Sequence, residues 1–337
     1  MKLKLYVDII FSFLVKKILI FLRNSISLSS VVLCFILPFL APSLLLPAGY
    51  SQDIIVVKTL SLPDGEQILN GFKSICDNNL SIKEYDMKGK LNVGKSVIGK
   101  IKKSIRSKNP PKAILTIGGP ATMLVQEAIT EIPILFCMVT NPKKKGFSGN
   151  NIRGITSDVP INVQIDKLKA IVPGVKSIGV IYNPKNTDNI IQEVEQVASE
   201  IGLNSILYEV SSQKEVPSAI RNVIKKVDAL LIITDSTVVN KNSFEYIITT
   251  TLENKIPTIS YTDYLVKAGL LASLTPDYFS IGEQAGNVVC KLQENESNTL
   301  TSIISPKKLN LAINLKTANR IGLKISPNIL DSAKVYK

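Results

Sequence analysis

Beyond residue 52 the chain alternates short apolar runs with longer stretches of helical periodicity. Runs such as "DIIVVKT" (53–59), "AILTIG" (113–118) and "SIGVIYN" (177–183) have the length and composition of buried strands, whereas the segments between them repeat apolar residues every three or four positions. Buried parallel strands need helices against both faces, so this alternation predicts βα units stacked around parallel sheets.

Two successive arrays of such units are separated by the Gly-, Asn- and Lys-rich stretch 141–151. Because 337 residues exceed one typical core, we expect an α/β fold with two doubly wound Rossmann-like lobes, each with a parallel central sheet. The helices are predicted at 65–77, 93–108 and 121–130, and then at 161–171, 187–201, 216–226 and 240–254. The predicted division is a leader at 1–51, a first lobe at 52–153 plus 274–298, and a second lobe at 154–273 plus 299–337.

The first fifty residues differ from the rest of the chain. Basic residues precede the apolar run "SLSSVVLCFILPFLAPSLLLPAGYSQ", which ends in small and turn-forming residues, the layout of a secretory signal. Residues 28–48 are also long enough to span a bilayer, although three prolines, Pro38, Pro42 and Pro47, disfavour a regular helix. The sequence predicts export to the periplasm or to the outer face of the cytoplasmic membrane. Whether the leader is cleaved near Ser51 or retained as an anchor stays open.

The composition excludes several classes of site. The chain has no histidine, which removes Ser-His-Asp triads, Cys-His dyads and His-ligated zinc, and its four cysteines form no C-x-x-C pair. We therefore expect no catalytic residue, no metal and no cofactor, and we interpret Cys76, Cys137 and Cys290 as small apolar side chains. The net charge is +13, but the lysines are dispersed without aromatic interleaving, so no nucleic-acid partner is expected.

The turn "IGGPAT" (117–122) is Gly-rich and stands between a strand and a helix, as phosphate-binding loops do. It lacks the spacing of dinucleotide-binding and P-loop motifs, so a nucleotide site is not expected. Gly118 and Gly119 permit close approach of the backbone to a ligand, and Pro120 suits the first turn of a helix.

Polar residues cluster where the predicted strands end. Five runs, "ILTIGGPAT", "LFCMVTNP", "GVIYNP", "LLIITDST" and "TISYTDY", break into Thr, Asn, Asp, Ser or Tyr. In doubly wound sheets the ligand crevice lies beyond the carboxyl ends of the strands, where helix N-termini favour anions. Together the five ends predict a ligand cleft, although each residue taken alone also suits an N-cap. In this hypothesis Asp235 or Asp263 holds an ammonium group, Thr122 and Thr140 hold a carboxylate, and tyrosines cover the remainder.

Longer stretches carry a family resemblance: "ILTIGGPATMLVQEAITEIPILFCMVTNP", "VDALLIITDSTVV", "KIPTISYTDYLVKAGLLASLTPDYFSIGEQAG" and "LNLAINLKTANRIGLKISPNIL". They resemble extracytoplasmic substrate-binding proteins of ABC importers, in the subgroup associated with tryptophan, tyrosine and related amino acids. The resemblance covers about 53–333. It implies a type I periplasmic-binding fold, a Venus flytrap with three interlobe crossings that closes around a small ligand.

The resemblance also implies which residues bind the ligand. Asn141 departs from the Asp that the family often has there, which removes a possible partner for an ammonium group. The loop 60–64 lacks the usual His or aromatic residue, which leaves the preference for the ligand side chain open. The implied ligand-binding set is Pro120, Ala121, Thr122, Thr140, Asn141, Asn183, Asp235, Ser236, Thr237 and Asp263.

The function expected from the sequence is that of an extracytoplasmic solute-binding protein of an ABC importer. It would bind an amino acid, aromatic or branched, or a related zwitterion in the interlobe cleft, and deliver it as a monomer to the transmembrane subunits of an ABC permease. It would have no enzymatic activity. A retained leader would instead favour a membrane-tethered sensor that presents its ligand-loaded state to a signalling partner. The third class, a Rossmann-like enzyme, is disfavoured because the chain lacks histidine and a phosphate loop.

Overall fold

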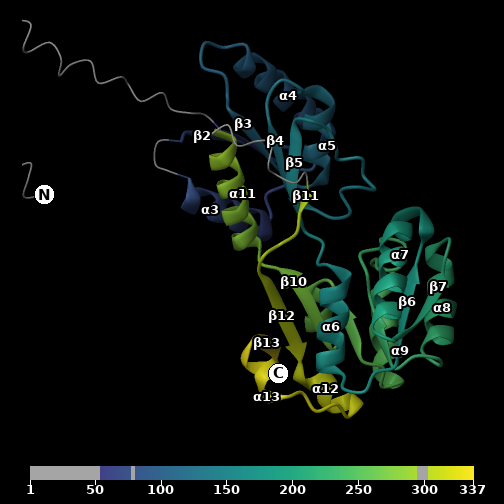
Figure 1. Cartoon of the computed structure of the whole chain (residues 1–337). Coiled ribbons are helices and arrows are strands. Elements are labelled where there is room, and N and C mark those ends of the chain that lie inside the picture. Colours follow the sequence, from purple (N-terminus) through teal and green to yellow (C-terminus); the bar gives the residue numbers. More distant parts are fainter. Residues whose placement is uncertain (1–53, 77–79, 294–302) are drawn as a thin grey trace, which may run out of the picture. The chain divides into compact units, whose positions relative to one another are not determined.

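The chain divides into two units, Met1–Ser51 and Gln52–Lys337. The computed structural model describes residues 54–76, 80–293 and 303–337, all within the second unit (Figure 1). The predictions about the leader, its cleavage and its anchoring therefore lie outside the described residues. Within the described ranges, no helix has both the length and the apolar composition that a bilayer crossing requires.

The first sheet has six strands in the order β11-β5-β4-β3-β1-β2, and every neighbouring pair is parallel. Leaving β11 aside, this is the 2-1-3-4-5 order of a doubly wound sheet, with its topological switch point between β1 and β3. The strands are β1 (Ile54–Lys58), β2 (Ile82–Asp86), β3 (Ala113–Ile117), β4 (Ile134–Val139), β5 (Ile152–Thr156) and β11 (Ile303–Ile304).

Two apolar clusters cover the two faces of this sheet. Alternate side chains of β1 divide between them, with Ile54 and Val56 in one cluster and Ile55 and Val57 in the other. The first cluster is completed by helices α3 and α11, and the second by α4 and α5. Because successive side chains of a strand point to opposite faces of the sheet, each face carries its own apolar cluster and its own layer of helices. The helices are α3 (Pro63–Ile75), α4 (Leu91–Ile105), α5 (Gly119–Ala128) and α11 (Tyr278–Gln293).

The second sheet has seven strands in the order β13-β12-β10-β9-β8-β6-β7 and repeats the same winding. Only the pairing of β10 with β12 is antiparallel among its described pairs. The strands are β6 (Ser177–Tyr182), β7 (Asn204–Glu209), β8 (Ala229–Leu231), β9 (Thr258–Ser260), β10 (Ala272–Pro276), β12 (Leu309–Asn314) and β13 (Ala333–Tyr336).

Helices again cover both faces of the second sheet. Helices α6, α7 and α12 contribute to one cluster with alternate residues of β8, and α8, α9 and α10 contribute to the other. The helices are α6 (Ile161–Ile171), α7 (Pro184–Glu200), α8 (Val216–Val223), α9 (Phe244–Glu253), α10 (Asp263–Ala268), α12 (Leu315–Ile321) and α13 (Pro327–Asp331), with a 3-10 turn, η1 (Gln213–Glu215), before α8.

The chain passes between the two sheets after β5, after β10 and after β11, so the described residues contain the three predicted crossings. The strand pairing moves the expected boundaries by a few residues. Residues 154–156 continue β5 beside β4, 274–276 complete β10 beside β12, and 303–304 pair with β5. Each of these strands keeps its hydrogen-bond ladder past the predicted limit. We therefore propose 54–158 plus 277–305 as the first lobe and 159–276 plus 306–337 as the second.

Most predicted helices lie within a few residues of their observed limits, and α6 matches its prediction. The main difference follows β8, where the strand expected to reach Asp235 ends at Leu231. The backbone N–H of Asp235 turns back to the carbonyl of Ile233 at 2.9 Å. The Ser243 hydroxyl donates to the Val238 carbonyl at 2.6 Å, which holds 238–243 as turns before α9 begins at Phe244.

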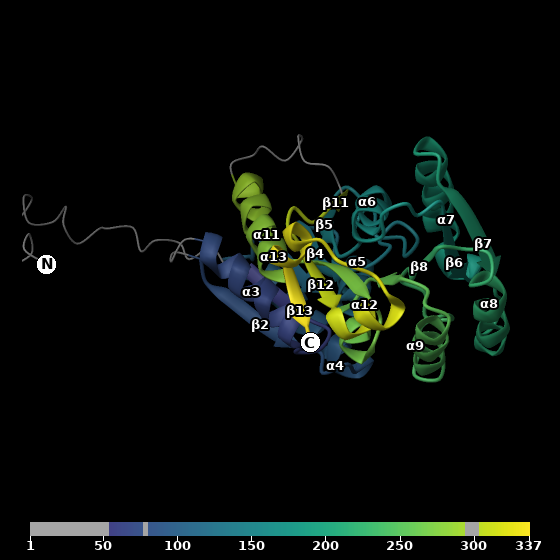
Figure 2. The same cartoon turned by 90° about the horizontal axis from the view of Figure 1, so that it is seen from below.

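Helix α11 lies beside α3 in both views, although the two are far apart in sequence (Figures 1 and 2). Their backbones touch because glycines stand at the contact. A Cβ added at Gly282 would fall on the carbonyl oxygen of Ile68, and one added at Gly71 would fall on that of Phe279. These two positions therefore need glycine for closeness of approach rather than for backbone conformation.

This contact predicts that Gly282→Ala lowers the free energy of unfolding by about 1–3 kcal/mol, because the added methyl group separates α3 from α11. Gly99→Ala in α4 is the matched control, since a Cβ there meets nothing within 4 Å. The control should gain about 0.5–1 kcal/mol from helix propensity. Urea unfolding followed by circular dichroism measures both values. An equal change in the free energy of unfolding for the two variants would contradict the backbone contact.

Candidate functional site

A cleft of about 1160 Å³ is lined by residues of both lobes and of the segments that connect them. Its walls follow the carboxyl ends of β4, β5, β9 and β10 and the start of β12. In doubly wound folds ligands bind beyond these strand ends, so the cleft occupies the position expected for a binding site.

Three of the ten predicted residues line the cleft: Thr140, Asn141 and Asp263. The other seven do not. Among these, Pro120 and Ser236 are exposed outside the cleft, and Ala121 is buried in the core of the first lobe. The remaining four, Thr122, Asn183, Asp235 and Thr237, are held in hydrogen bonds within their own lobes.

The switch point of the first sheet is filled by its own side chains. The Thr59 hydroxyl accepts the backbone N–H of Ala121 at 3.0 Å, which satisfies one donor at the start of α5. Thr122 is fully buried, and its hydroxyl donates to the Gly118 carbonyl at 3.0 Å and lies 2.9 Å from the hydroxyl of Thr116. Pro120, Ala121 and Thr122 thus fix α5 to β3 rather than face the cleft.

Asp235 fills the switch point of the second sheet in the same way. Its carboxylate, 1% exposed, accepts the backbone N–H of Asn183 at 2.7 Å and that of Thr237 at 2.8 Å. It also accepts the Asn186 amide at 2.9 Å and the Thr187 hydroxyl at 3.1 Å. Four donors surround one carboxylate at the N-terminus of α7, where the helix dipole favours an anion.

The proposed role of Asp235 as an ammonium partner is therefore not supported by its position. Its side chain is occupied by four hydrogen bonds, and it does not line the cleft. Asn183 is the N-cap of α7, as its side chain accepts the backbone N–H of Lys185 at 3.0 Å. Thr237 accepts both amides, from Asn183 and Asn186, at 3.0 Å. These contacts agree with the alternative that the polar residues at this strand end cap a helix rather than bind a ligand.

Two carboxylates of different lobes approach each other in the cleft. Asp64 lies in the first turn of α3, and Asp263 is the first residue of α10. Burial and the charge of Asp263 raise the pKa of Asp64 above its usual value. Burial and the same two carboxylates raise the pKa of the nearby Tyr278 to about 12. Asp263 also accepts the Ser273 hydroxyl at 2.8 Å and pairs with the exposed Lys334 at 3.4 Å.

A second polar group lies at the end of β5. Asp158 accepts the backbone N–H of Asn141 at 2.6 Å and the Thr156 hydroxyl at 2.7 Å, while burial raises its pKa. Lys145 donates to the Thr140 hydroxyl at 3.2 Å. Loss of hydration lowers the pKa of Lys145, and the Asp158 carboxylate acts in the opposite direction. The hydroxyl oxygen of Ser157 is buried and has no hydrogen-bond partner among the described residues.

A bulge in β4 shapes the wall between these groups. The register of β4 against β5 shifts between Phe136 and Val139, and Met138 has a left-handed backbone with φ of 57°. Such bulges change the direction of a side chain, and a positive φ is uncommon for methionine. Met138 therefore becomes part of the cleft lining, beside residues of the connecting segments.

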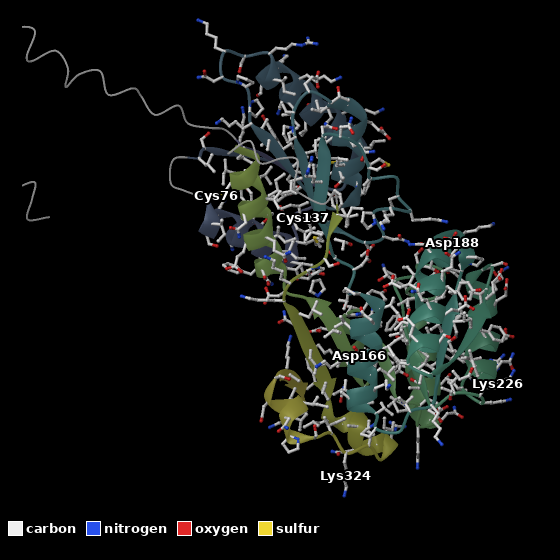
Figure 3. All side chains as sticks on the ribbon, in the orientation of Figure 1. Cys76, Cys137, Asp166, Asp188, Lys226 and Lys324 are labelled. Carbon is white, nitrogen blue, oxygen red and sulfur yellow. The ribbon has the colours of Figure 1, made fainter. Side chains whose placement is uncertain are left out.

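Polar side chains join the two lobes at one edge of the cleft. Asn141 and Asn189 exchange reciprocal amide hydrogen bonds at 3.0 Å, and Asn141 also donates to the Asn186 carbonyl at 3.3 Å. Lys144 pairs with Asp188, labelled at the start of α7 in Figure 3, at 2.8 Å. Asn141 thus serves in an interlobe contact, with its φ of 46° in a region that asparagine tolerates.

Sequence reasoning missed Asp64, Met138, Lys145, Ser157 and Asp158, all of which line the cleft. Two of these, Ser157 and Asp158, had a usable signal. The stretch "ITSDVP" (155–160) leaves a strand through Thr, Ser and Asp, as the five chosen strand ends do. The positions of Asp64 and Lys145 had none, because they follow a helix start and a loop rather than a strand end.

Two lobes with doubly wound sheets and a polar cleft between them define the type I class of periplasmic-binding folds. Solved structures confirm the fold. A ligand-free, open structure of a substrate binding protein with adhesive properties from Clostridium difficile has a TM-score of 0.72 at 22% identity, covering 85% of this chain and 99% of that one. An ABC domain in complex with L-Trp from Streptococcus pneumoniae has a TM-score of 0.60 at 22% identity, with the same two coverages.

The sequence comparison then gives the family. Residues 54–337 match the model of the ABC transporter substrate binding protein family, and the chain belongs to that family. A curated relative, the tyrosine-binding protein of Clostridioides difficile (strain R20291), is 29% identical over 192 residues, which is 55% of this chain. The match likewise spans about half of that relative, 55% of its length.

The cluster around Asp235 predicts a role in stability rather than in ligand binding. Asp235→Ala leaves the backbone N–H groups of Asn183 and Thr237 without their acceptor and removes one acceptor of the Asn186 amide and the Thr187 hydroxyl, so the free energy of unfolding should fall by about 3 kcal/mol or more. Asp166→Ala, at an exposed position of α6 (Figure 3), is the control and should change it by less than about 0.5 kcal/mol. Both values come from chemical denaturation. A stable Asp235→Ala protein would contradict the structural assignment.

Proposed function

We propose that this substrate-binding protein captures a small zwitterion, an amino acid with an apolar or aromatic side chain, and delivers it to an ABC importer. The observation that carries the proposal is the presence of separate acidic and basic groups in one cleft lined by both lobes. In this proposal the protein is exported, works as a monomer, and passes the ligand to the transmembrane subunits of the permease without enzymatic chemistry.

The ammonium group of the ligand would lie between Asp64 and Asp263. The two carboxylates come from different lobes, and burial together with repulsion from Asp263 raises the pKa of Asp64. A cation between them relieves this repulsion and interacts with both lobes at once. Asp263 replaces Asp235 as the ammonium partner, and Asp64 is added.

The carboxylate of the ligand would lie near Ser157 and Lys145. The Ser157 hydroxyl is buried without a partner among the described residues, and Lys145 supplies a positive charge at the cleft wall. Helix α6 begins next to them at Ile161, and the backbone N–H of Ile161 donates to the Glu193 carboxylate, which also lines the cleft, at 3.3 Å. Two kinds of donor, a hydroxyl and an ammonium group, therefore converge on this end of the cleft.

The preference for an apolar side chain is supported by the remaining lining and by the relatives. Met138, Ile233, Leu274 and Tyr261 all line the cleft. The curated relative is named a tyrosine-binding protein, and the streptococcal neighbour was solved with L-Trp. When the two lobes close around such a ligand, the closed conformation gains population. The size of the gain is set by the contacts that the ligand makes in the closed conformation alone.

A thermal-shift screen of the protein against the amino acids tests this function. A ligand at 100 times its dissociation constant adds about 2.7 kcal/mol, which corresponds to about 5–10 °C in a chain of this size. Tyrosine, tryptophan or a branched amino acid should raise Tm, whereas tyramine, without the carboxylate, and hydroxyphenylpropionate, without the ammonium, should not. A shift with sugars or peptides alone would overturn the amino-acid proposal.

Asp64 provides a second test, with opposite effects on the empty and the liganded protein. Asp64→Asn should weaken amino-acid binding by about 10- to 150-fold, since a hydrogen bond to a charged group contributes about 1.5–3 kcal/mol. The same substitution should raise the Tm of the empty protein at pH 7, because it removes a desolvated charge that Asp263 repels. Asp166→Asn is the control, and it should leave both affinity and Tm unchanged.

The pH dependence of binding follows from the same carboxyl. A bound ammonium favours the ionised form of Asp64, so affinity should fall as pH decreases through the raised pKa of that group, above its usual value near 4. In the empty protein the sign is reversed, since a raised pKa contributes stability at low pH that is lost as pH rises through it. Calorimetric titration between pH 4 and 8 measures the affinity. An unchanged profile in Asp64→Asn would exclude this residue.

A further inference from the structure

Helices α3 and α11 run in the same direction with their backbones in contact. A Cβ at Gly282 would meet the carbonyl of Ile68 and the amide of Phe72, whereas one at Gly286 would meet Phe72 and Ile75. A step of four residues along α11 is therefore matched by a step of about four along α3. This register is fixed by backbone contact, which leaves little freedom for the two helices to slide.

The next step of the same register brings two cysteines together. Four residues beyond Gly286 stands Cys290, in the last turn of α11. On the other helix Cys76 follows Ile75 directly and is held as the C-cap of α3 by a backbone hydrogen bond to the Phe72 carbonyl at 3.2 Å. Cys76 is labelled in Figure 3, and it packs against the apolar cluster to which Val288 and Val289 of α11 belong.

The electrostatics of Cys76 agree with this placement. Burial and the neighbouring Cys290 thiol raise the pKa of Cys76 to about 12. An influence of one thiol on the other requires the two sulfur atoms to be near each other, because Coulomb interactions fall off with distance. Both side chains are half-buried and in the thiol form in the structure. The third described cysteine, Cys137, is fully buried in β4 within the same apolar cluster.

We propose that Cys76 and Cys290 form a structural disulfide bond once the chain reaches an oxidising extracytoplasmic compartment. The oxidant is a disulfide of the compartment, R–S–S–R. One cysteine thiolate attacks it and releases one R–SH, and the second cysteine thiolate then attacks the mixed disulfide and releases the other R–SH. Both thiol protons leave, the S–S bond forms, and the two electrons are taken up by the oxidant.

Such a bond would connect the chain on either side of 159–276, the first and larger part of the second lobe. The segment between the two cysteines contains β2 to β10, which includes most of both sheets. Closing so long a loop lowers the entropy of the unfolded chain more than a short loop does. A thiol with the raised pKa of Cys76 is also a poor leaving group, so thiolates reduce the bond slowly. These properties suit a permanent bond better than a redox switch.

Peptide mapping of the full chain, isolated from the exported fraction of expressing cells, tests the bond. After blocking with iodoacetamide under denaturing, non-reducing conditions, trypsin should yield peptide 74–83 joined to peptide 268–291. Dithiothreitol should separate the two. The peptide 113–143, which carries Cys137, should be alkylated in both samples and serves as the internal control.

Thermal unfolding gives an independent measurement. Dithiothreitol should lower the Tm of the wild-type protein by on the order of 5–10 °C and leave the double variant Cys76→Ala/Cys290→Ala unchanged. The Tm of the double variant should equal that of the reduced wild type. This agreement shows that the double variant folds. Alkylation of both peptides in the non-reduced digest would overturn the proposal, and so would their linkage to peptides of a second chain. Amino-acid binding is measured in a separate experiment, so its presence or absence does not affect the peptide map or the Tm comparison.

Discussion

The close packing of α11 on α3 is the contact on which the two-lobed structure depends. Helix α11 follows five strands of the second sheet, β6 to β10, in sequence, yet its apolar residues complete the core of the first lobe against Ile68, Leu69 and Phe72. Neither lobe is a continuous piece of chain, because α11 belongs to the first lobe and the chain then returns to the second sheet in β12 and β13. Glycines at the contact bring the two backbones together without intervening side chains. The dispersion attraction between the two helices is therefore strong for a contact of this length.

The polar residues of the sheets divide into two functional groups. Those at the switch points, such as Thr59 with Ala121 and Asp235 with Asn183, satisfy helix starts inside one lobe. Those nearer the crossings, such as Asp64, Asp263 and Ser157, lie in the cleft between lobes. The first group fixes the walls of the cleft, and the second group lines it. The same residue types thus have different roles according to which strand end they follow.

This division explains how far the sequence could predict the structure. The apolar periodicity located the sheets and α6, because burial on both faces determines those patterns. Three of the predicted strand-end residues, Thr140, Asn141 and Asp263, line the cleft, but Asp235 and Asp263 were indistinguishable, since each follows a buried strand and precedes a helical pattern. What separates them is the set of donors around Asp235, which comes from residues about fifty positions away. The approach of Asp64 to Asp263 depends on the crossings and has no local sequence signal.

The late position of α11 also bears on the order in which the core can form during synthesis. Until residues near 290 have been synthesised, the first lobe lacks one of the helices that cover its sheet, and the apolar face of α3 stays exposed. The discontinuous first lobe therefore cannot complete its apolar core until almost the whole chain exists.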